Sequence, residues 1–333
     1  MNQLVTGGIS VLNKGEFIKK QILVYEPFLG DKMSYKNDNM VIRDGNGKIK
    51  YQVSCYRIFM VLIVGDVTIT TGILRRQQKF GFRLCFLTLG LKVYSVIGPQ
   101  LQGNTLLHCK QYAYDELTVG KSIIINKILN QRAALTRLRS KTEDVRECIS
   151  LLEQYSKRLQ NDSLNLQEII GIEGMASKIY FPRIFSNTQW IGRKPRIKFD
   201  YINTLLDIGY NALFNFIDAI LQVFGFDVYY GVLHTCFYMR KSLVCDIMEP
   251  MRPIVDWQIR KSINLKQFKQ DDFVQVGKQY QLKYKKSTQY LQVFLEAILN
   301  YKEEIFVYVR DYYRSFMKNN PIEAYPVFKL EEL

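Results

Sequence analysis

The sequence predicts an α+β protein, in which a small N-terminal β domain precedes a larger all-α domain. Two observations support this prediction. Short β-branched or aromatic runs separated by turn residues dominate residues 21–94. The apolar spacing then becomes helical after a stretch marked by Gly98-Pro99 and Gly103-Asn104. A chain of 333 residues is also long enough for two domains. The expected division is a β domain at 1–97, a linker at 98–112 and a helical domain at 113–333.

The N-terminal part has the composition of a small sheet domain. Its strand-forming runs are Ile22–Tyr25, Met40–Arg43, Ile58–Val64 and Phe82–Leu87. Turn signals separate these runs, notably Asp44-Gly-Asn-Gly47 and Gly65-Asp66. One short helix is expected between the last two strands, at Thr70–Phe80.

Helical periodicity characterises the rest of the chain. It begins with the apolar series Ile124, Ile128, Leu135 and Leu138. A longer helix is expected after Asp200, and Gly225 supplies a stop for it. A further long helical pattern covers 291–316 and is closed by two prolines, Pro321 and Pro326.

The charge balance favours a polyanionic partner. The chain holds 46 Lys and Arg against 31 Asp and Glu, a formal charge of +15. Each phosphate neutralised by Lys or Arg releases counterions, which makes nucleic acid the natural candidate; a merely basic soluble protein is the alternative. Residues 1–95 hold 14 basic and 6 acidic residues, so the positive charge is not confined to the helical part.

The cysteines and the apolar runs indicate a cytoplasmic protein without a membrane segment. The six cysteines form no CxxC pair and show no zinc-ligand spacing. The opening MNQLVTGGIS lacks the layout of a signal peptide. The longest apolar run, Ile58–Val64, is about a third of the ~20 residues that a membrane span needs.

Candidate site residues cluster between residues 170 and 256. His234 follows Gly231 in a glycine-bounded loop between helices, and Asp246 and Glu249 share one face of a short helix that Pro250 bends or ends. A histidine alone is more often a bystander, and an acidic pair is more often an exposed edge.

Glu173 stands in an apolar helical stretch beside Gly171 and Gly174. Helical glycine costs about 1 kcal/mol relative to alanine, so the pair needs a reason. Close helix packing is one, and room for a substrate backbone beside Glu173 is the other. Together with His234 and a further carboxylate, Glu173 would form an oxygen-rich site suited to Mn²⁺ or Mg²⁺.

The order of these motifs resembles that of the CRISPR-associated adaptation integrases. The motifs are Ile172-Glu-Gly-Met-Ala-Ser177, Gly192-Arg193, Asp200-Tyr-Ile-Asn203, Gly231-Val-Leu-His234 and Ser242-Leu-Val-Cys-Asp-Ile-Met-Glu249. The resemblance implies an N-terminal β domain, a helical catalytic domain, and joining of the 3′-hydroxyl of a captured DNA fragment to a repeat array. It implies Glu173, His234 and Glu249 as metal ligands and Asp246 as their catalytic neighbour.

The resemblance also implies partners. It implies a homodimer that binds double-stranded DNA and joins a small dimeric subunit in a hetero-hexameric complex. Transesterification by a 3′-hydroxyl needs no protein nucleophile, and Asp246 is the acid expected to accept a proton or hold a metal-bound water. The expected phosphate contacts are Arg183, Arg193, Arg196, Arg240, Lys241 and Arg252. A structure-selective nuclease acting on branched DNA and a non-catalytic DNA-binding scaffold remain alternatives.

Overall fold

The computed structural model describes residues 14–99, 104–186, 188, 190–194, 197–234 and 237–330. These residues form two compact units. The first contains the described residues up to 99 together with Ser287–Gln292, and the second contains the others. Helix α3 (Thr105–Ala113) occupies most of the segment expected as a linker, 98–112, and belongs to the second unit.

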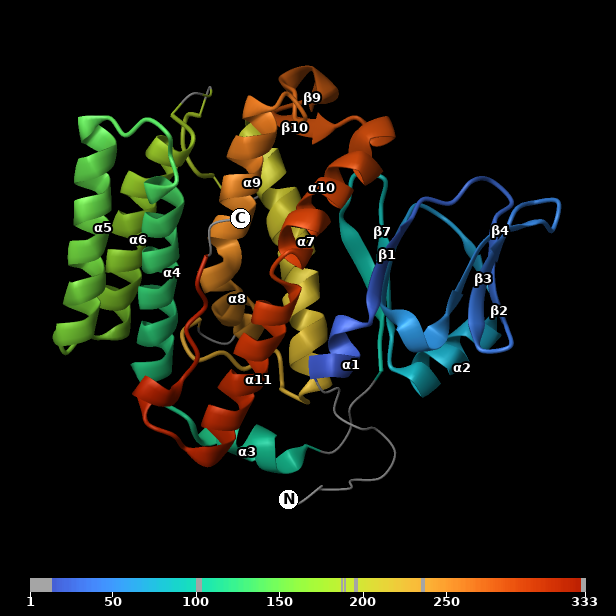
Figure 1. Cartoon of the computed structure of the whole chain (residues 1–333), viewed down its shortest axis with the longest axis horizontal. Helices are drawn as coiled ribbons and strands as arrows, with labels where there is room; N and C mark the ends of the chain where they lie inside the picture. Colours follow the sequence, from blue (N-terminus) through green and yellow to red (C-terminus); the bar gives the residue numbers. More distant parts are fainter. Residues whose placement is uncertain are drawn as a thin grey trace. The chain divides into compact units, whose positions relative to one another are not determined.

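The first unit is built from two four-stranded sheets (Figure 1). One sheet has the order β1 (Gln21–Tyr25), β5 (Ile58–Val64), β7 (Arg83–Leu87) and β8 (Val93–Ile97). Its first three strands are parallel and β8 is antiparallel. The other has the order β4 (Ile49–Ser54), β3 (Asn39–Arg43), β2 (Lys32–Lys36) and β6 (Thr68–Ile69). Two helices, α1 (Lys14–Ile18) and α2 (Thr71–Phe80), complete the unit.

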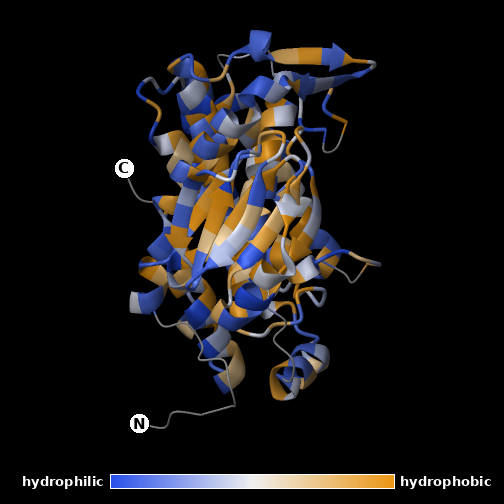
Figure 2. Ribbon diagram, turned by 90° about the vertical axis from the view of Figure 1, so that its right-hand side faces the viewer, coloured by the Kyte–Doolittle hydropathy of each residue, from blue (hydrophilic) through white to orange (hydrophobic). Residues whose placement is uncertain are grey.

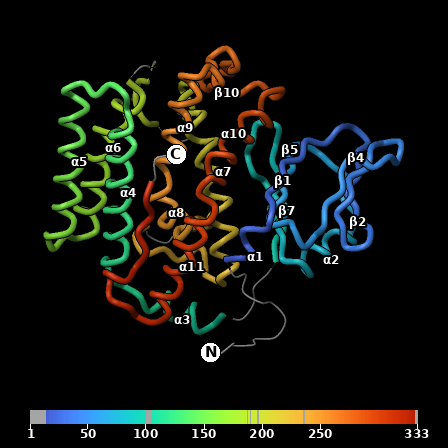
Figure 3. The backbone as a smooth tube through the Cα atoms, viewed as in Figure 1, coloured from blue at the N-terminus to red at the C-terminus, as the bar shows by residue number. Residues whose placement is uncertain are grey.

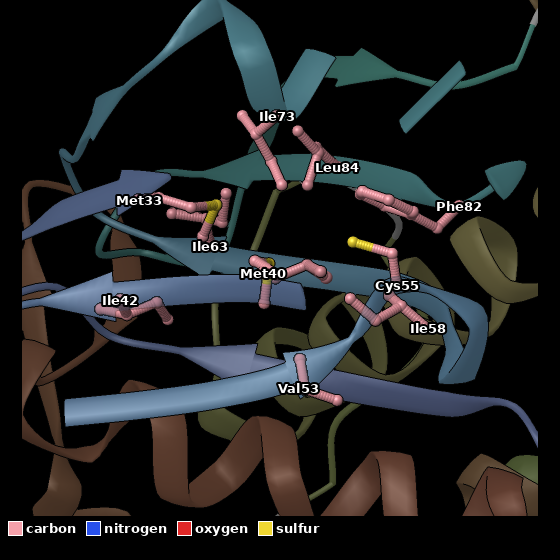
Figure 4. Packing of buried hydrophobic residues seen from close by; sticks show 11 residues of the cluster. Met33, Met40, Ile42, Val53, Cys55, Ile58, Ile63, Ile73, Phe82 and Leu84 are labelled. Carbon is pink, nitrogen blue, oxygen red and sulfur yellow. The ribbon is translucent and has the colours of Figure 1, made fainter. Parts of the chain in front are cut away.

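Apolar side chains from both sheets and α2 make the core of this unit. Met33 and Met40 lie in one sheet, Ile63 and Leu84 in the other, and Ile73 projects from α2; all are fully buried (Figure 4). Every residue of β5 is buried, as its unbroken apolar run predicts. The four predicted strands and the predicted helix are confirmed, whereas β2, β4, β6 and β8 were not predicted.

The described part of the second unit consists mainly of helices and contains one hairpin. Its remaining α-helices are α4 (Thr118–Thr136), α5 (Glu143–Asn161), α6 (Leu166–Ile184), α7 (Tyr201–Val223), α8 (Ser242–Met248), α9 (Arg252–Asn264), α10 (Ser287–Leu299) and α11 (Lys302–Lys318). The first turn of α10 groups with the other unit. The hairpin pairs β9 (Phe273–Val276) with β10 (Gln279–Leu282). Polar residues interrupt the apolar ones along the helices (Figure 2), and no described helix is long and apolar enough to cross a membrane.

Helix α7 forms as predicted. Asp200 is its N-cap, and its carboxylate accepts the backbone N–H of Asn203 at 2.6 Å. The helix ends before Gly225, whose φ of +80° is the left-handed conformation that glycine adopts without strain.

The predicted continuous helical pattern at 291–316 is instead two helices. Helix α10 ends at Leu299 and α11 begins at Lys302. Tyr301, at the junction, stays buried and packs against Phe328 with ring centroids 5.7 Å apart. Because burial continues through the turn, the apolar periodicity does not reveal the break.

A C-terminal segment, Val327–Leu330, lies against α4 (Figure 3). The side-chain amide of Asn126 exchanges two hydrogen bonds with the backbone of Phe328, at 2.7 and 2.8 Å. Asn130 accepts the N–H of Leu330 at 3.0 Å and donates to the carbonyl of Pro250 at 2.9 Å. Two buried asparagines therefore tie this segment to α4, and one of them also holds the residue after Glu249.

Candidate active site

The loop that carries His234 is organised by a buried carboxylate. Asp246 on α8 has no exposed surface, and its Oδ2 accepts the backbone N–H groups of Val232 and Leu233 at 2.7 and 3.1 Å. Its Oδ1 accepts the N–H of His234 at 3.1 Å and lies 2.5 Å from that residue's ring Nδ1. Both carboxylate oxygens are therefore directed at the loop and not toward solvent.

Gly231 lets the loop close this tightly around Asp246. A Cβ on Gly231 would lie 2.5 Å from Asp246 Oδ2 and 2.9 Å from the carbonyl of His234. The imidazole is held through Nδ1, and a neutral ring that donates from Nδ1 leaves the lone pair of Nε2 available to a ligand. In this motif Gly231 thus leaves room for Asp246, whereas His234 offers a ligand atom.

Glu173 lies in the middle of α6. That helix begins with a capping box, in which Asn165 and Glu168 each bond the other's backbone N–H. The Glu173 carboxylate accepts the hydroxyl of Ser177, one turn later, at 3.0 Å and contacts Lys127 of α4. Gly171 and Gly174 are exposed, and a Cβ on either would meet no atom within 4 Å. Close helix packing therefore does not explain the two glycines.

Glu249 follows α8 directly, in a 3-10 turn, Glu249–Met251. Its side chain is 5% exposed, with Lys127 Nζ 2.7 Å from Oε2 and Arg252 Nη2 2.9 Å from Oε1. Burial alone would raise the pKa of Glu249, but the charges of Arg252 and Lys127, with a smaller contribution from His234, lower it to about 2. Glu249 is thus a buried carboxylate that stays ionised because cations surround it. The predicted bend at Pro250 is confirmed.

Lys127 joins the two glutamates and is not among the predicted site residues. Its ammonium contacts Glu173 and Glu249, although its side chain is only 8% exposed. Burial acts to lower the pKa of Lys127, and the two carboxylates raise it above its ordinary value. The sequence does contain a signal for Lys127. It shares the helical spacing of a buried face with Ile124, Gln131 and Leu135, and an unpaired lysine on such a face would be costly.

Arg252 is held by a network beneath Glu249. Its guanidinium lies over the ring of Tyr210, 4.7 Å from the centroid. The hydroxyl of Tyr210 donates to the carboxylate of Asp256 at 2.5 Å. Asp256 is fully enclosed, and burial raises its pKa to about 6 despite the hydrogen bond from Tyr210. This network fixes Arg252, and through it the position of Glu249.

The residues proposed as ligands do not form a ready-made metal cluster. Within the part of the chain that the structure describes, no three His, Cys, Asp or Glu side chains are grouped closely enough to hold a metal ion. Glu173 and Glu249 converge on Lys127, while His234 is paired with Asp246. Glu249 Oε2, although close to Lys127, is buried without a well-directed hydrogen bond. Two carboxylates and an imidazole are nevertheless donors that suit Mg²⁺ or Mn²⁺.

The basic residues predicted to contact phosphate have varied surroundings. Arg183 pairs with Asp144, Arg193 with Asp207 (3.1 Å), Lys241 with Asp218 (2.8 Å) and Arg252 with Glu249. Arg240 is partly exposed, and Arg196 lies outside the described residues. Among the five that the structure describes, only Arg252 contacts one of the site carboxylates. DNA contact by any of these residues stays a prediction.

The fold is thus that of an α+β protein. Its candidate active site, made of acids and a histidine, lies in the helical unit. A family model described as CRISPR associated protein Cas1 matches residues 29–296, a range that contains the whole site. The chain belongs to this family.

Individual relatives agree with this assignment. The "CRISPR-associated endonuclease Cas1 1" of Thermodesulfovibrio yellowstonii is 31% identical over 226 residues, covering 64% of this chain and 71% of the relative. Two solved structures share the fold over 94% of this chain. One is a Cas6-RT-Cas1–Cas2 complex (TM-score 0.78, 21% identity). This protein covers 36% of the matching chain in that complex. The other is a casposase bound to integration product (TM-score 0.76, 20% identity, 96% of that chain).

Proposed function

We propose that this protein is the metal-dependent DNA integrase of CRISPR adaptation, which joins the 3′-hydroxyl of a captured fragment to the repeat array by transesterification. The observation that carries the proposal is the convergence of Glu173 and Glu249 on one cation, next to a histidine that Asp246 orients. The family membership and the casposase-like fold support it.

Glu173, Glu249 and Nε2 of His234 would hold Mg²⁺ or Mn²⁺. The bound ion supplies charge stabilisation at the phosphate that is attacked. Arg252, which packs on the ring of Tyr210, keeps Glu249 in place. Asp246 keeps the imidazole of His234 oriented with Nδ1 toward its own carboxylate. In this scheme Asp246 is a positioning residue, since both of its oxygens serve the loop, and this role replaces the proton acceptor expected from the sequence.

We further propose double-stranded DNA as the substrate and a homodimer joined by a small dimeric subunit as the working assembly. The solved complex that contains Cas1 and Cas2 supports the second part. The formal charge of +15 supports the first. Light scattering, with and without the small subunit, measures the assembly.

The decisive experiment uses a labelled DNA fragment and a plasmid that carries a repeat. Strand transfer should require Mg²⁺ or Mn²⁺ and stop with EDTA. Hydrolysis of branched DNA without strand transfer would instead favour the nuclease alternative. DNA binding without either reaction would favour the scaffold alternative.

A further inference from the structure

Lys127 occupies the position between the two carboxylates of the site. Its Nζ contacts Glu173 Oε1 and lies 2.7 Å from Glu249 Oε2. The side chain comes from α4, whereas the glutamates come from α6 and from the turn after α8. One ammonium thus links three separate elements of the helical unit.

The charges explain why an ammonium is needed there. Two ionised carboxylates that share one small space repel each other, and a cation between them removes that repulsion. A buried lysine, in turn, is tolerated when it is paired with acids. Lys127 and the two glutamates therefore stabilise one another in protein that holds no metal.

The same two carboxylates are the ligands proposed for the divalent ion. An ammonium 2.7 Å from one of these oxygens repels a dication that approaches the same oxygens. The long, unbranched lysine side chain can swing away without a change in the backbone. Lys127 and the metal are consequently competitors for Glu173 and Glu249.

We propose that Lys127 is a built-in counter-ion of the metal site, a positioning residue that holds Glu173 and Glu249 together before metal binds and that the divalent ion displaces. The proposal rests on the proposed function, because it takes these glutamates as metal ligands. It implies that wild-type protein binds the ion less tightly than its ligand set alone would allow.

The test measures Mn²⁺ affinity by calorimetry at pH 7.5, on full-length protein freed of metal. Lys127→Met keeps the length of the side chain and removes its charge, and Lys127→Gln is a second, more polar variant. Either variant should bind Mn²⁺ about tenfold more tightly than wild type, because the competing charge is gone. In EDTA, Lys127→Met should melt lower than wild type by about 3 °C or more, and Mn²⁺ should recover most of this loss.

Lys50→Met is the matched control. It removes an ammonium 2.7 Å from a buried aspartate, Asp31, in the other unit, so its melting loss should not respond to Mn²⁺ and its Mn²⁺ affinity should equal that of wild type. If wild type binds Mn²⁺, Glu173→Gln abolishes that binding, and the Lys127 variants bind equally or less tightly, the counter-ion role is overturned while the proposed function stands. If neither wild type nor the Lys127 variants bind Mn²⁺, the metal-dependent function itself is overturned.

Discussion

Nδ1 of His234 lies 2.5 Å from Oδ1 of Asp246, and the same carboxylate accepts three consecutive backbone N–H groups of the loop that carries the histidine. One buried side chain therefore sets both the path of the loop and the direction of the ring. Loss of such a supporting carboxylate typically costs about 10–100-fold in metal affinity or activity.

Replacing this carboxylate should impair the chemistry. In Asp246→Asn, one carboxylate oxygen becomes an amide NH2 group, which cannot accept the N–H groups that donate to Asp246 in the wild type. The loop and the imidazole ring of His234 are then no longer held. We expect strand transfer to fall by about 100-fold, with weaker Mn²⁺ binding. Asp227→Asn is the control, because Asp227 accepts from Tyr112 and the N–H of Tyr229 nearby without a contact to His234. Equal losses in both variants would show a general loop effect.

Removing Glu173 should separate DNA binding from catalysis. Glu173→Ala should lose strand transfer by about two orders of magnitude or more, the scale for a lost electrostatic contact in the transition state. Without metal, it should bind DNA as well as wild type or slightly better, since a carboxylate that repels phosphate is gone. Filter binding over a salt series measures this. Much weaker metal-free binding would mean that Glu173 organises the fold instead.

The two glycines beside Glu173 give a prediction about stability. A methyl group on Gly171 or Gly174 meets no atom within 4 Å. Gly→Ala at either position should therefore stabilise the protein by about 0.4–1 kcal/mol, seen as a higher denaturation midpoint. If the open face is where a DNA backbone approaches, the double alanine variant should also bind DNA more weakly. A fall in stability would contradict the open geometry.

Asp256 should make stability depend on pH. Its folded pKa of about 6 lies above the ordinary value of 3.8, so the folded state holds the proton more tightly than the unfolded chain. Its contribution to stability is fully present below about pH 4 and is lost as pH rises through about 6. Asp256→Asn lacks this loss, so its stability relative to wild type should rise by about 2–3 kcal/mol between pH 4 and 7. Urea denaturation at several pH values measures the difference in stability between Asp256→Asn and wild type. A difference that stays constant from pH 4 to 7 would show that Asp256 does not titrate in this range.

Two adjacent basic residues should differ in their effect on DNA binding. Arg240→Ala should reduce the slope of log affinity against log salt by about one unit, as loss of one phosphate contact does. Lys241 lies 2.8 Å from the buried carboxylate of Asp218, so Lys241→Met should mainly lower stability and change the slope less. Equal slope changes would show that DNA draws Lys241 away from Asp218.

The sequence predicted the elements whose periodicity is strong. The apolar run of β5 and the capped helix α7 both appear where expected, because burial on all sides and an N-cap aspartate leave clear patterns. The break at Tyr301 was missed because apolar spacing continues across it. The hairpin β9–β10 was missed for a different reason, since each strand has only four residues and buries only one of them, Phe273 in β9 and Leu282 in β10.

For the site, motif order located the acids and the histidine but did not give their partners. Nothing in the spacing of Asp246 and Glu249 shows that one faces the loop and the other faces Lys127, since that depends on the turn at Pro250 and on where α4 packs. Lys127 lies 46 positions before Glu173 in the chain, and its sequence pattern indicates only that it is buried, not which acids it contacts. Tertiary packing supplies such pairs, and local pattern does not.

The bond between Asn126 and Phe328 spans 202 positions of the chain. During synthesis, α4 emerges from the ribosome long before the segment that satisfies its buried amides. At about 5–20 residues per second, that interval lasts roughly 10–40 seconds. Until Phe328 is made, the side-chain amide of Asn126 lacks its backbone partner, so the helical unit cannot reach its final packing as α4 appears. Assembly of the candidate active site is thus postponed until the segment Val327–Leu330 has been made.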